Sequence, residues 1–597
     1  MTDKRVLLSG NEAIARGAYE SGVKVATAYP GTPSTEILES LREYKGLHAE
    51  WAPNEKVALE TGMGAAFGGA RALVAMKHVG VNVAADPLFT LSYTGLRGGL
   101  VLVTADDPEM HSSQNEQDNR HYARFAKVPM LEPSDSQEAK DFTALAFELS
   151  EKFDTPVMLR TTTRVSHSKS IVSLQEPRVP PVRPKLTKEP MKFVMLPANA
   201  RKRHPIVEKR MEELTRFAET FPENRIEAGD NRVGIITSGI SYEYAKEIMP
   251  EASYLKLGMV YPLPKEMIRS FASRVERLFV VEELDPFIED QVRAMGIEVS
   301  GKDLFPLCGE LTPGLVAKGL KGLHPPAVEE TYKGLPGRPP IMCPGCPHRG
   351  IFSILSKLKL FVTGDIGCYT LGFLPPLSAI DTCVCMGASI GHAMGLDKAL
   401  GKEALGKVVA VIGDSTFLHS GITGLLNVVY NKGMVTVIIL DNRTTAMTGR
   451  QDHPGTGFTL QGEETFSVDL AKLARGLGVK HVKVVNPYDL AATERIIKRE
   501  VQRPEPSVII ARAPCVLSRR ERTGLEKPFS VNADLCLGCR ACLRLGCPAV
   551  KWIKEDGAGP QGKKRKGRTA IESFLCNGCT LCAQVCQCGA IKETDGK

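Results

Sequence analysis

Apolar residues in the C-terminal half of the chain come in short runs that end in acidic or amide residues. One run ends at Gly413-Asp414-Ser415, and a second, from Met434 to Leu440, ends at Asp441-Asn442. Apolar runs rich in β-branched residues predict buried strands, and the segment between these two is compatible with a helix. Because parallel strands of a βαβ unit end at the same edge of a sheet, we expect Asp414 and Asn442 to face each other.

The residue types at this edge suit a hard divalent cation. Mg²⁺ prefers an octahedron of oxygens, which the Asp414 carboxylate, the Asn442 amide, a carbonyl at Thr444 and phosphate oxygens would complete. The spacing resembles the thiamine-diphosphate motif, GDG followed after roughly 25–30 residues by N. Gly413, Asp414 and Ser415 take the first three positions, with serine where the motif has glycine. An ordinary α/β half-domain also has this order of strand, Asp, helix, strand and Asn.

Residues 1–175 alternate apolar runs with helical stretches of small residues, which predicts a doubly wound α/β domain. A strand from Val23 to Ala28 leads into a Pro/Gly turn that contains Thr32, and Ser34 is placed to cap a helix that begins near Thr35. Such a loop at the carboxyl end of a strand is a usual place for substrate contacts. On the turn alone, a plain strand-to-helix connection is the favoured interpretation.

Glu55 stands at the head of the next predicted helix, directly after Asn54. A carboxylate is favoured there by the helix dipole, which is the simple explanation for it. The alternative is catalytic, because thiamine enzymes need a carboxylate against N1′ of the aminopyrimidine. Glu55 is in the right setting for that role.

Proline-rich segments divide the rest of the chain. Residues 176–230 are predicted to be a linker, since 176–205 contain seven prolines and many charges. Residues 231–335 form a second α/β segment, which opens with the apolar run 233–239. A second proline-rich joint then leads into residues 336–520, which contain the Asp414 motif.

Length and composition indicate a multidomain protein of the cytoplasm. The 597 residues are too many for one hydrophobic core, and 43% hydrophobic with 24% charged residues is typical of a water-soluble chain. We expect no membrane partner, because no apolar run approaches about 18 residues and the N-terminus lacks a signal sequence. The basic run at 563–568 has no interleaved aromatic residues, so we expect no nucleic-acid partner.

Fifteen of the 16 cysteines lie from Cys343 onward, which in a cytosolic chain indicates metal thiolates rather than disulfides. Two runs near the C-terminus follow the bacterial ferredoxin pattern, in which three close thiolates bind one [4Fe–4S] cluster and the fourth cysteine binds the other cluster. The first ferredoxin set is therefore Cys536, Cys539, Cys542 and Cys586, and the second is Cys576, Cys579, Cys582 and Cys547.

These two runs depart from the usual pattern in two places. Four residues separate Cys542 from Cys547 in the first run, where the usual pattern has three. In the second run, Gln587 rather than proline follows Cys586. An additional thiol, Cys588, makes the last ligand of the first set less certain. Zinc is the alternative metal, but two CxxCxxC triplets argue against it.

Thiamine features in two separate segments, followed by a two-cluster ferredoxin segment, resemble the 2-oxoacid:ferredoxin oxidoreductases. The domain order is similar to that of indolepyruvate:ferredoxin oxidoreductase α subunits, and the resemblance covers nearly the whole chain. Its most specific marks are Tyr29-Pro30-Gly31-Thr32-Pro33, Asn54-Glu55-Lys56, Cys343-Pro344-Gly345-Cys346-Pro347-His348, Gly364-Asp365-Ile366-Gly367-Cys368 and Met447-Thr448-Gly449-Arg450-Gln451.

The resemblance implies an α/β fold with four domains. Two doubly wound domains that bind thiamine diphosphate occupy 1–175 and 336–520, a transketolase-C-like α/β domain occupies 231–335, and a bacterial-type two-cluster ferredoxin domain occupies 526–597. By the same resemblance, Thr32 contacts the 2-oxoacid, Glu55 contacts the pyrimidine, and Asp414, Asn442 and the Thr444 carbonyl bind Mg²⁺.

In the wider family a further cluster lies near the thiamine. The matching positions here are Cys343, Cys346, Cys368 and Cys515, which we call the CPGC set. A CPGC turn with two buried free thiols is the alternative, and on motif grounds the two are about equally favoured. Cys383 and Cys385 have no assigned role and fit ordinary buried thiols.

The function implied is oxidative decarboxylation of arylpyruvates of the indolepyruvate type to the aryl-acetyl-CoA. Electrons pass through the clusters to ferredoxin, coenzyme A takes the acyl group, and a smaller β subunit completes the enzyme. Two alternatives stay open: the same reaction with another 2-oxoacid, and a non-oxidative thiamine-dependent decarboxylase with an appended ferredoxin module. The second would leave the eight ferredoxin cysteines without a purpose.

Overall fold

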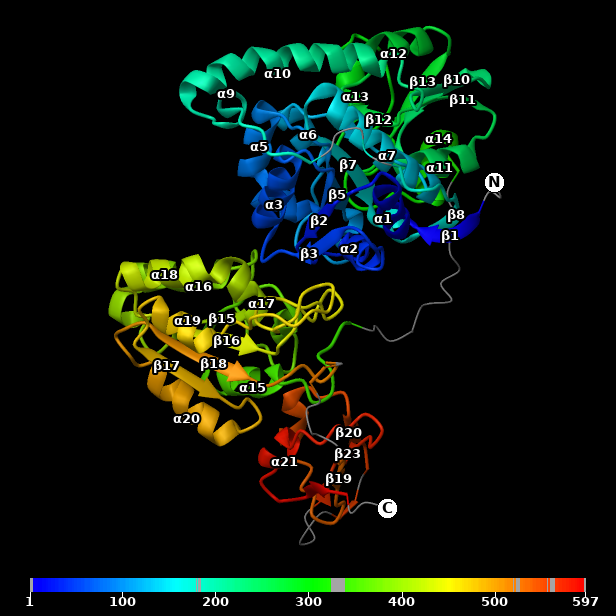
Figure 1. The fold of residues 1–597 in the computed structure, drawn as a ribbon. Helices are drawn as coiled ribbons and strands as arrows, with labels where there is room; N and C mark the ends of the chain where they lie inside the picture. Colours follow the sequence, from blue (N-terminus) through cyan, green and yellow to red (C-terminus); the bar gives the residue numbers. More distant parts are fainter. Residues whose placement is uncertain are drawn as a thin grey trace. The chain divides into compact units, whose positions relative to one another are not determined.

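The computed structural model describes residues 4–178, 180, 184–323, 339–518, 520–521, 527–555, 557–558 and 564–594. The chain forms two compact units, the N-terminal unit Met1–Leu335 and the C-terminal unit Pro336–Lys597 (Figure 1). The boundaries expected at 335 and 526, and residue 563 of the basic run, lie outside the described residues. Within the described ranges, no helix is both long enough and apolar enough to span a bilayer.

The N-terminal unit is built on a seven-stranded sheet in which all neighbouring strands run parallel except the edge pair β12 and β6. In spatial order the strands are β12 (Met259–Tyr261), β6 (Met130–Leu131), β7 (Val157–Thr162), β5 (Leu100–Asp106), β4 (Ala72–Lys77), β2 (Val25–Ala28) and β3 (His48–Trp51). The central strands β4, β5 and β7 are fully buried, as expected of a parallel sheet covered on both faces.

Helices and an antiparallel pair surround this sheet. The helices are α1 (Gly10–Glu20), α2 (Thr35–Leu41), α3 (Glu55–Phe67), α4 (His78–Val83), α5 (Ala85–Thr94), α6 (Arg120–Ala126), α7 (Ser136–Phe153) and α8 (Thr163–His167). Strands β1 (Arg5–Ser9) and β8 (Lys169–Ser173) pair at one side. Helix α2 begins where the sequence predicts, but Ser34 does not cap it: its hydroxyl donates to the Gly31 carbonyl instead (2.9 Å).

Residues 225–321 add a second, four-stranded sheet to the same unit. Its order is β13 (Arg277–Val281), β10 (Asp230–Thr237), β11 (Ala252–Lys256) and β9 (Arg225–Glu227), accompanied by α11 (Gly239–Ile248), α12 (Lys265–Ala272), α13 (Phe287–Arg293) and α14 (Pro313–Lys321). One hydrophobic core contains Leu88 and Leu102 as well as Leu255 and Phe287. Residues 4–175 and 231–323 therefore share a core within one compact unit.

The segment predicted as a linker, 176–230, contains more structure than expected. Helices α9 (Pro190–Phe193) and α10 (Pro197–Ala218) lie in it, and α10 buries Val207 and Leu214. Pro205 falls inside α10. The proline count suggested an irregular linker because proline usually ends a helix, but α10 packs against α5 and buries its apolar positions, which outweighs that preference.

The C-terminal unit contains a five-stranded parallel sheet, ordered β14 (Phe361–Thr363), β15 (Val408–Gly413), β16 (Thr436–Asp441), β18 (Ser507–Arg512) and β17 (His481–Val485). Helices α15 (His348–Leu358) and α20 (Leu490–Glu500) pack on one face, and α16 (Ala388–Leu400), α18 (Ile422–Tyr430) and α19 (Leu470–Gly476) on the other (Figure 1). Successive residues of β15 enter opposite cores, so its apolar run is continuous.

The remainder of this unit is a small segment of short strands. Antiparallel pairs join β19 (Phe529–Val531) to β24 (Ile591–Glu593), β20 (Val550–Ile553) to β23 (Arg568–Ile571), and β21 (Gly557–Ala558) to β22 (Lys564–Arg565). Helix α21 (Leu581–Gln584) lies beside them, and the segment's small core includes the thiols of Cys542 and Cys582.

Candidate functional site

Asp414 lies at the carboxyl end of β15, in the short helix α17 (Asp414–Thr416). Its Oδ1 accepts the Ser415 N–H and its Oδ2 accepts the Arg443 N–H, both at 2.8 Å. Arg443 directly follows Asn442, so the ends of β15 and β16 bring Asp414 and the segment after β16 together. Asn442 and Thr444 are themselves buried, and the Thr444 N–H donates to Asn442 Oδ1 (3.3 Å).

The charge state of Asp414 suits a metal ligand. Burial raises the pKa of this carboxyl, but His453 and the N–H groups of Ser415 and Arg443 outweigh burial and hold the pKa below its ordinary value. His453 Nε2 lies 3.3 Å from Asp414 Oδ2. That ring nitrogen is buried and makes no hydrogen bond of good geometry among the described residues. An ionised carboxylate, an amide oxygen and buried carbonyls are the donor set that Mg²⁺ prefers, so these residues fit the ion.

The residues on either side of Asp414 explain why the motif tolerates serine at its third position. A Cβ on Gly413 would come within 2.6 Å of Tyr369 Cε1, so glycine is required at this first position. Ser415, in contrast, is accommodated: its Oγ accepts a hydrogen bond from Thr445 Oγ1 at 2.8 Å. That bond ties α17 to the segment after β16.

A second group of polar residues lies in the N-terminal unit around the half-buried Thr32. Ser112 Oγ donates to the Thr32 carbonyl (3.2 Å), and Lys77 Nζ donates to the Ser112 carbonyl (2.6 Å). A Cβ on Gly31 would stand 3.0 Å from the Lys77 Cβ, so the Thr32 loop packs on the lysine side chain. Burial lowers the pKa of Lys77 to about 8, although Asp107 acts in the opposite direction.

Glu55 is the first residue of α3 and is buried. Asn54 caps this helix, since its Oδ1 accepts the Val57 N–H at 2.9 Å. Gly80 of α4 lies directly against the Glu55 carboxyl: a Cβ on Gly80 would stand 2.8 Å from Glu55 Oε1. Glycine at 80 therefore leaves room for this buried carboxyl group.

The four thiols of the CPGC set come together in the C-terminal unit. Burial raises the pKa of Cys346 to about 12 and that of Cys368 to about 11, with further increases from neighbouring thiols of the same set. The fourth member, Cys515, donates its main-chain N–H to the Asn442 carbonyl at 2.9 Å. The CPGC set therefore adjoins the Asp414 edge, and ionisation of its buried thiols requires a compensating positive charge such as a metal.

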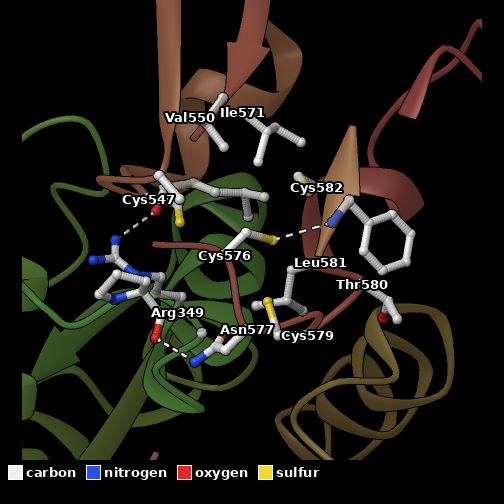
Figure 2. A pocket seen from close by; sticks show the side chains of 15 residues that line it. Arg349, Cys547, Val550, Ile571, Cys576, Asn577, Cys579, Thr580, Leu581 and Cys582 are labelled. Atoms are coloured by element: carbon white, nitrogen blue, oxygen red, sulfur yellow. Dashed lines mark hydrogen bonds between the residues drawn. The ribbon is translucent and has the colours of Figure 1, made fainter. Parts of the chain in front are cut away.

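The second ferredoxin set lines a cavity in the C-terminal unit (Figure 2). Cys547, Cys576, Cys579 and Cys582 all face this cavity, although Cys547 comes from the other cysteine run. Apolar residues line the rest, among them Phe529, Val550, Ile571 and Leu581. The Phe529 N–H points at Cys576 Sγ (3.4 Å), a bond of the kind that tunes thiolate-bound clusters.

Cys539, Cys542 and Cys586 of the first ferredoxin set also lie near one another, with Cys588 as an additional candidate thiol. Cys542 interacts electrostatically with Cys539 and Cys586, which belong to different runs. The sulfurs of Cys586 and Cys588 lie 3.6 Å apart. Hydrogen bonds from the main chain at Leu537 and Ala590 outweigh burial and hold the pKa of Cys588 below its usual value, so both thiols are placed for ligation.

Zinc sites and iron–sulfur clusters differ in the spacing of their sulfur ligands. A tetrahedral zinc site with bonds of about 2.3 Å places its sulfurs about 3.8 Å apart. Among the described residues, the only three candidate ligand atoms within 4.8 Å of one another belong to Asp118, His121 and Asp285. Asp118 there is already held by Arg120. In a cubane each thiolate binds a different iron, so wider spacing is expected.

Sequence reasoning missed several residues and misjudged one. Lys77, Ser112 and Arg349 were not singled out, although Lys77 ends an apolar strand and Asp414 directly follows one. Cys383 is half-buried, and its thiol donates to the Asp365 carbonyl (3.5 Å). Cys385 is exposed, so the expectation of a buried thiol is wrong there.

Two protein families match separate parts of the chain. Residues 16–227 match "Pyruvate flavodoxin/ferredoxin oxidoreductase, thiamine diP-bdg", and residues 365–511 match "Thiamine pyrophosphate enzyme, C-terminal TPP binding domain". The first range contains Thr32 and Glu55, and the second contains Asp414 and Asn442. A solved 2-oxoglutarate:ferredoxin oxidoreductase from Magnetococcus marinus is 17% identical with a TM-score of 0.45, over 53% of this chain and 65% of that chain.

Relatives named indolepyruvate oxidoreductase subunit IorA align along almost the entire chain. The protein from Archaeoglobus fulgidus is 44% identical over 99% of this chain and 97% of its own length. Those from Pyrococcus horikoshii and Methanothermobacter marburgensis are 43% and 42% identical, over 99% of this chain and 97% and 98% of their own lengths. With thiamine-type domains and this full-length similarity, the chain belongs to the indolepyruvate oxidoreductase subunit IorA family.

Proposed function

We propose that this chain is the thiamine-diphosphate-binding α subunit of an enzyme that oxidatively decarboxylates indolepyruvate and related arylpyruvates. The observation that carries the proposal is the main-chain hydrogen bond from Cys515 to Asn442. It places the CPGC set beside Asp414 and Asn442, the candidate ligands of the Mg²⁺ that accompanies thiamine diphosphate. A thiamine enzyme that only decarboxylates has no need of thiols beside its cofactor. An oxidoreductase needs an electron acceptor there.

The residues that would hold the thiamine cofactor are divided between two segments of the chain. Asp414, Asn442 and the Thr444 carbonyl would bind Mg²⁺, with Gly413 and Ser415 beside it. Glu55 would hold the aminopyrimidine and control its proton. The bound cofactor supplies the carbanion chemistry of decarboxylation, and the protein supplies position and proton control.

Within the N-terminal unit, Thr32 and Lys77 are the residues that would receive the oxoacid. A 2-oxoacid carries a carboxylate, and Lys77 Nζ is a buried cation held beside the Thr32 loop through Ser112. A charged hydrogen bond in such a desolvated place contributes about 1.5–3 kcal/mol. Lys77 would therefore bind the substrate carboxylate and Thr32 would contact the substrate.

Iron–sulfur clusters would occupy three thiol sets. The first and second ferredoxin sets would each hold a [4Fe–4S] cluster within a two-cluster ferredoxin domain, and the CPGC set would hold a third cluster beside the Asp414 edge. Electrons would leave by this route to ferredoxin, while coenzyme A takes the acyl group. A smaller β subunit would complete the enzyme, as the designation of the relatives as subunits suggests.

The test is anaerobic reduction of methyl viologen by the purified complex with a panel of 2-oxoacids, with and without coenzyme A. We expect arylpyruvates to give the highest kcat/KM, and the acyl-CoA to form in step with viologen reduction. An Asp414→Ala complex is the matched control and should give no reduction. Release of CO₂ and aldehyde without viologen reduction would instead identify a non-oxidative decarboxylase.

A further inference from the structure

Arg349, on α15, is a buried cation between two cysteine sets. Its side chain is only about 3% exposed. Nε donates to the Cys343 carbonyl (3.1 Å) and Nη1 to the Leu545 carbonyl (2.9 Å), while Nη2 donates to the Met342 carbonyl. The guanidinium thereby connects the CPGC loop, residues 342–346, to Leu545, which lies two positions before Cys547.

Carbonyl oxygens satisfy the N–H groups of Arg349, but they do not neutralise its charge. In the described part of the chain, no carboxylate lies within ion-pair distance of this guanidinium. Buried charges are costly unless they are paired. The thiols of Cys547, Cys346, Cys343 and Cys579 are close enough to interact electrostatically with it.

Figure 2 shows Arg349 at the side of the cavity that contains Cys547, Cys576 and Cys579. These thiols become thiolates when they bind iron, and negative charge then appears on both sides of the guanidinium. The counter-charge that Arg349 lacks among carboxylates would thus come from the two thiol sets themselves.

We propose that the positive charge of Arg349 stabilises the reduced state of the clusters held by the CPGC set and by the second ferredoxin set. The proposal rests on the proposed function, because it requires clusters at these two sets. Each electron that the oxoacid supplies adds one negative charge to a cluster, and ferredoxin removes it. A fixed guanidinium between two clusters raises the reduction potential of both.

Further hydrogen bonds fix the CPGC set relative to the second ferredoxin set, so that Arg349 can interact with both. Asn577 Nδ2 donates to the Pro344 carbonyl (2.9 Å), and the Tyr488 hydroxyl donates to the Gly345 carbonyl (2.7 Å). Gln584, on α21, donates in turn to the Tyr488 carbonyl (2.6 Å). The CPGC loop is therefore fastened to the segment that carries the second ferredoxin set.

The experiment is a redox titration of the purified complex, followed by electron paramagnetic resonance, for the parent and three variants. Arg349→Gln removes the charge, Arg349→Lys keeps it, and Arg544→Gln removes an exposed arginine next to Leu545 as the control. We expect Arg349→Gln to lower the reduced-to-oxidised ratio of one or both clusters about tenfold at a fixed potential, equivalent to about 59 mV. Arg349→Lys should stay near the parent because it keeps the positive charge, and Arg544→Gln should do so because an exposed charge is screened by solvent and salt.

Parental midpoint potentials in Arg349→Gln would overturn the proposal. Loss of iron in Arg349→Gln but not in Arg349→Lys would support it, because the charge is then needed to hold the clusters. Loss of iron in both variants, with circular dichroism unchanged, would show that the guanidinium acts by shape and would also overturn it. If the parent complex itself lacked these cluster signals, the proposed function would fail first.

Discussion

Lys77 is the residue whose protonation should be visible in the kinetics. Its pKa is lowered to about 8 by burial, partly opposed by Asp107, so its charge is present below that pH and lost above it. If Lys77 binds the substrate carboxylate, kcat/KM for the oxoacid should fall as pH rises through about 8. Lys77→Met should lower kcat/KM roughly 10- to 100-fold at neutral pH, mainly through KM.

Lys77→Arg is the matched control for this pH dependence. An arginine keeps its charge to well above pH 10, so the variant should lose the alkaline fall even if its activity is reduced. An alkaline fall of the same size and midpoint in Lys77→Arg would assign the titration to another group.

Cys586 and Cys588 give a second test on single residues, since their sulfurs lie 3.6 Å apart and either thiol would complete the proposed first ferredoxin set. The ferredoxin spacing selects Cys586. We expect Cys586→Ser to lose the iron of one [4Fe–4S] cluster, while Cys588→Ser keeps the parental iron content. Iron analysis of the pair decides the assignment, and the reverse pattern would make Cys588 the ligand.

At the scale of the secondary-structure elements, the buried carboxyl of Glu283, just after β13, connects that strand to the segment before α14. Glu283 Oε1 accepts the Leu311 N–H at 3.0 Å. Burial raises the pKa of Glu283 to about 7, against a downward effect of this hydrogen bond and Arg160. The folded state therefore binds a proton between about pH 4.5 and pH 7 that the unfolded state does not. The associated stabilisation is complete below that range and is lost as pH rises through it.

Replacing Glu283 by glutamine should remove this part of the pH dependence. The free energy of unfolding of the variant, relative to the parent, should rise between pH 5 and pH 8 by up to about 3 kcal/mol. Thermal unfolding midpoints of parent and variant at the two pH values measure this. A variant-minus-parent difference that is the same at both pH values would contradict the assignment.

The elements themselves were largely predictable, because each depends on a local pattern. The apolar runs before Gly413 and Asp441 are β15 and β16, and α2 and α3 begin at the predicted Thr35 and Glu55. Helix α10 was missed because it is stabilised by packing against α5, which a count of prolines does not register.

Residues that act through long-range contacts were not predictable. Lys77 and Ser112 are 35 positions apart, and Arg349 and Leu545 are 196 apart. Neither pair forms a motif, and each arginine or lysine alone fits an ordinary exposed position. The motif residues Asp414 and Asn442 were found because two neighbouring parallel strands impose their proximity.

At the scale of the whole molecule, loss of the metal edge should leave the iron of the ferredoxin segment intact. Asp414→Ala removes a carboxylate at the end of β15, whereas the second ferredoxin set lines a separate cavity. We expect the variant to lose Mg²⁺-dependent binding of thiamine diphosphate, measured by calorimetry, and to keep the iron of both ferredoxin sets. Coupled loss of iron and thiamine binding in a folded variant would show that the two sites are not independent.

The hydrogen bonds of Arg349, Asn577 and Gln584 limit how far the chain can be shortened from its C-terminus. A chain cut near residue 520 would keep every strand of the five-stranded sheet, yet the Pro344 carbonyl would lose its donor and the Arg349 Nη1 group its acceptor. The open face would then expose Arg349 together with Tyr488 and Leu490, which pack against the core of the C-terminal segment. The C-terminal segment is thus part of the fold of the thiamine-type domain, and a minimal catalytic fragment without it should be prone to aggregation.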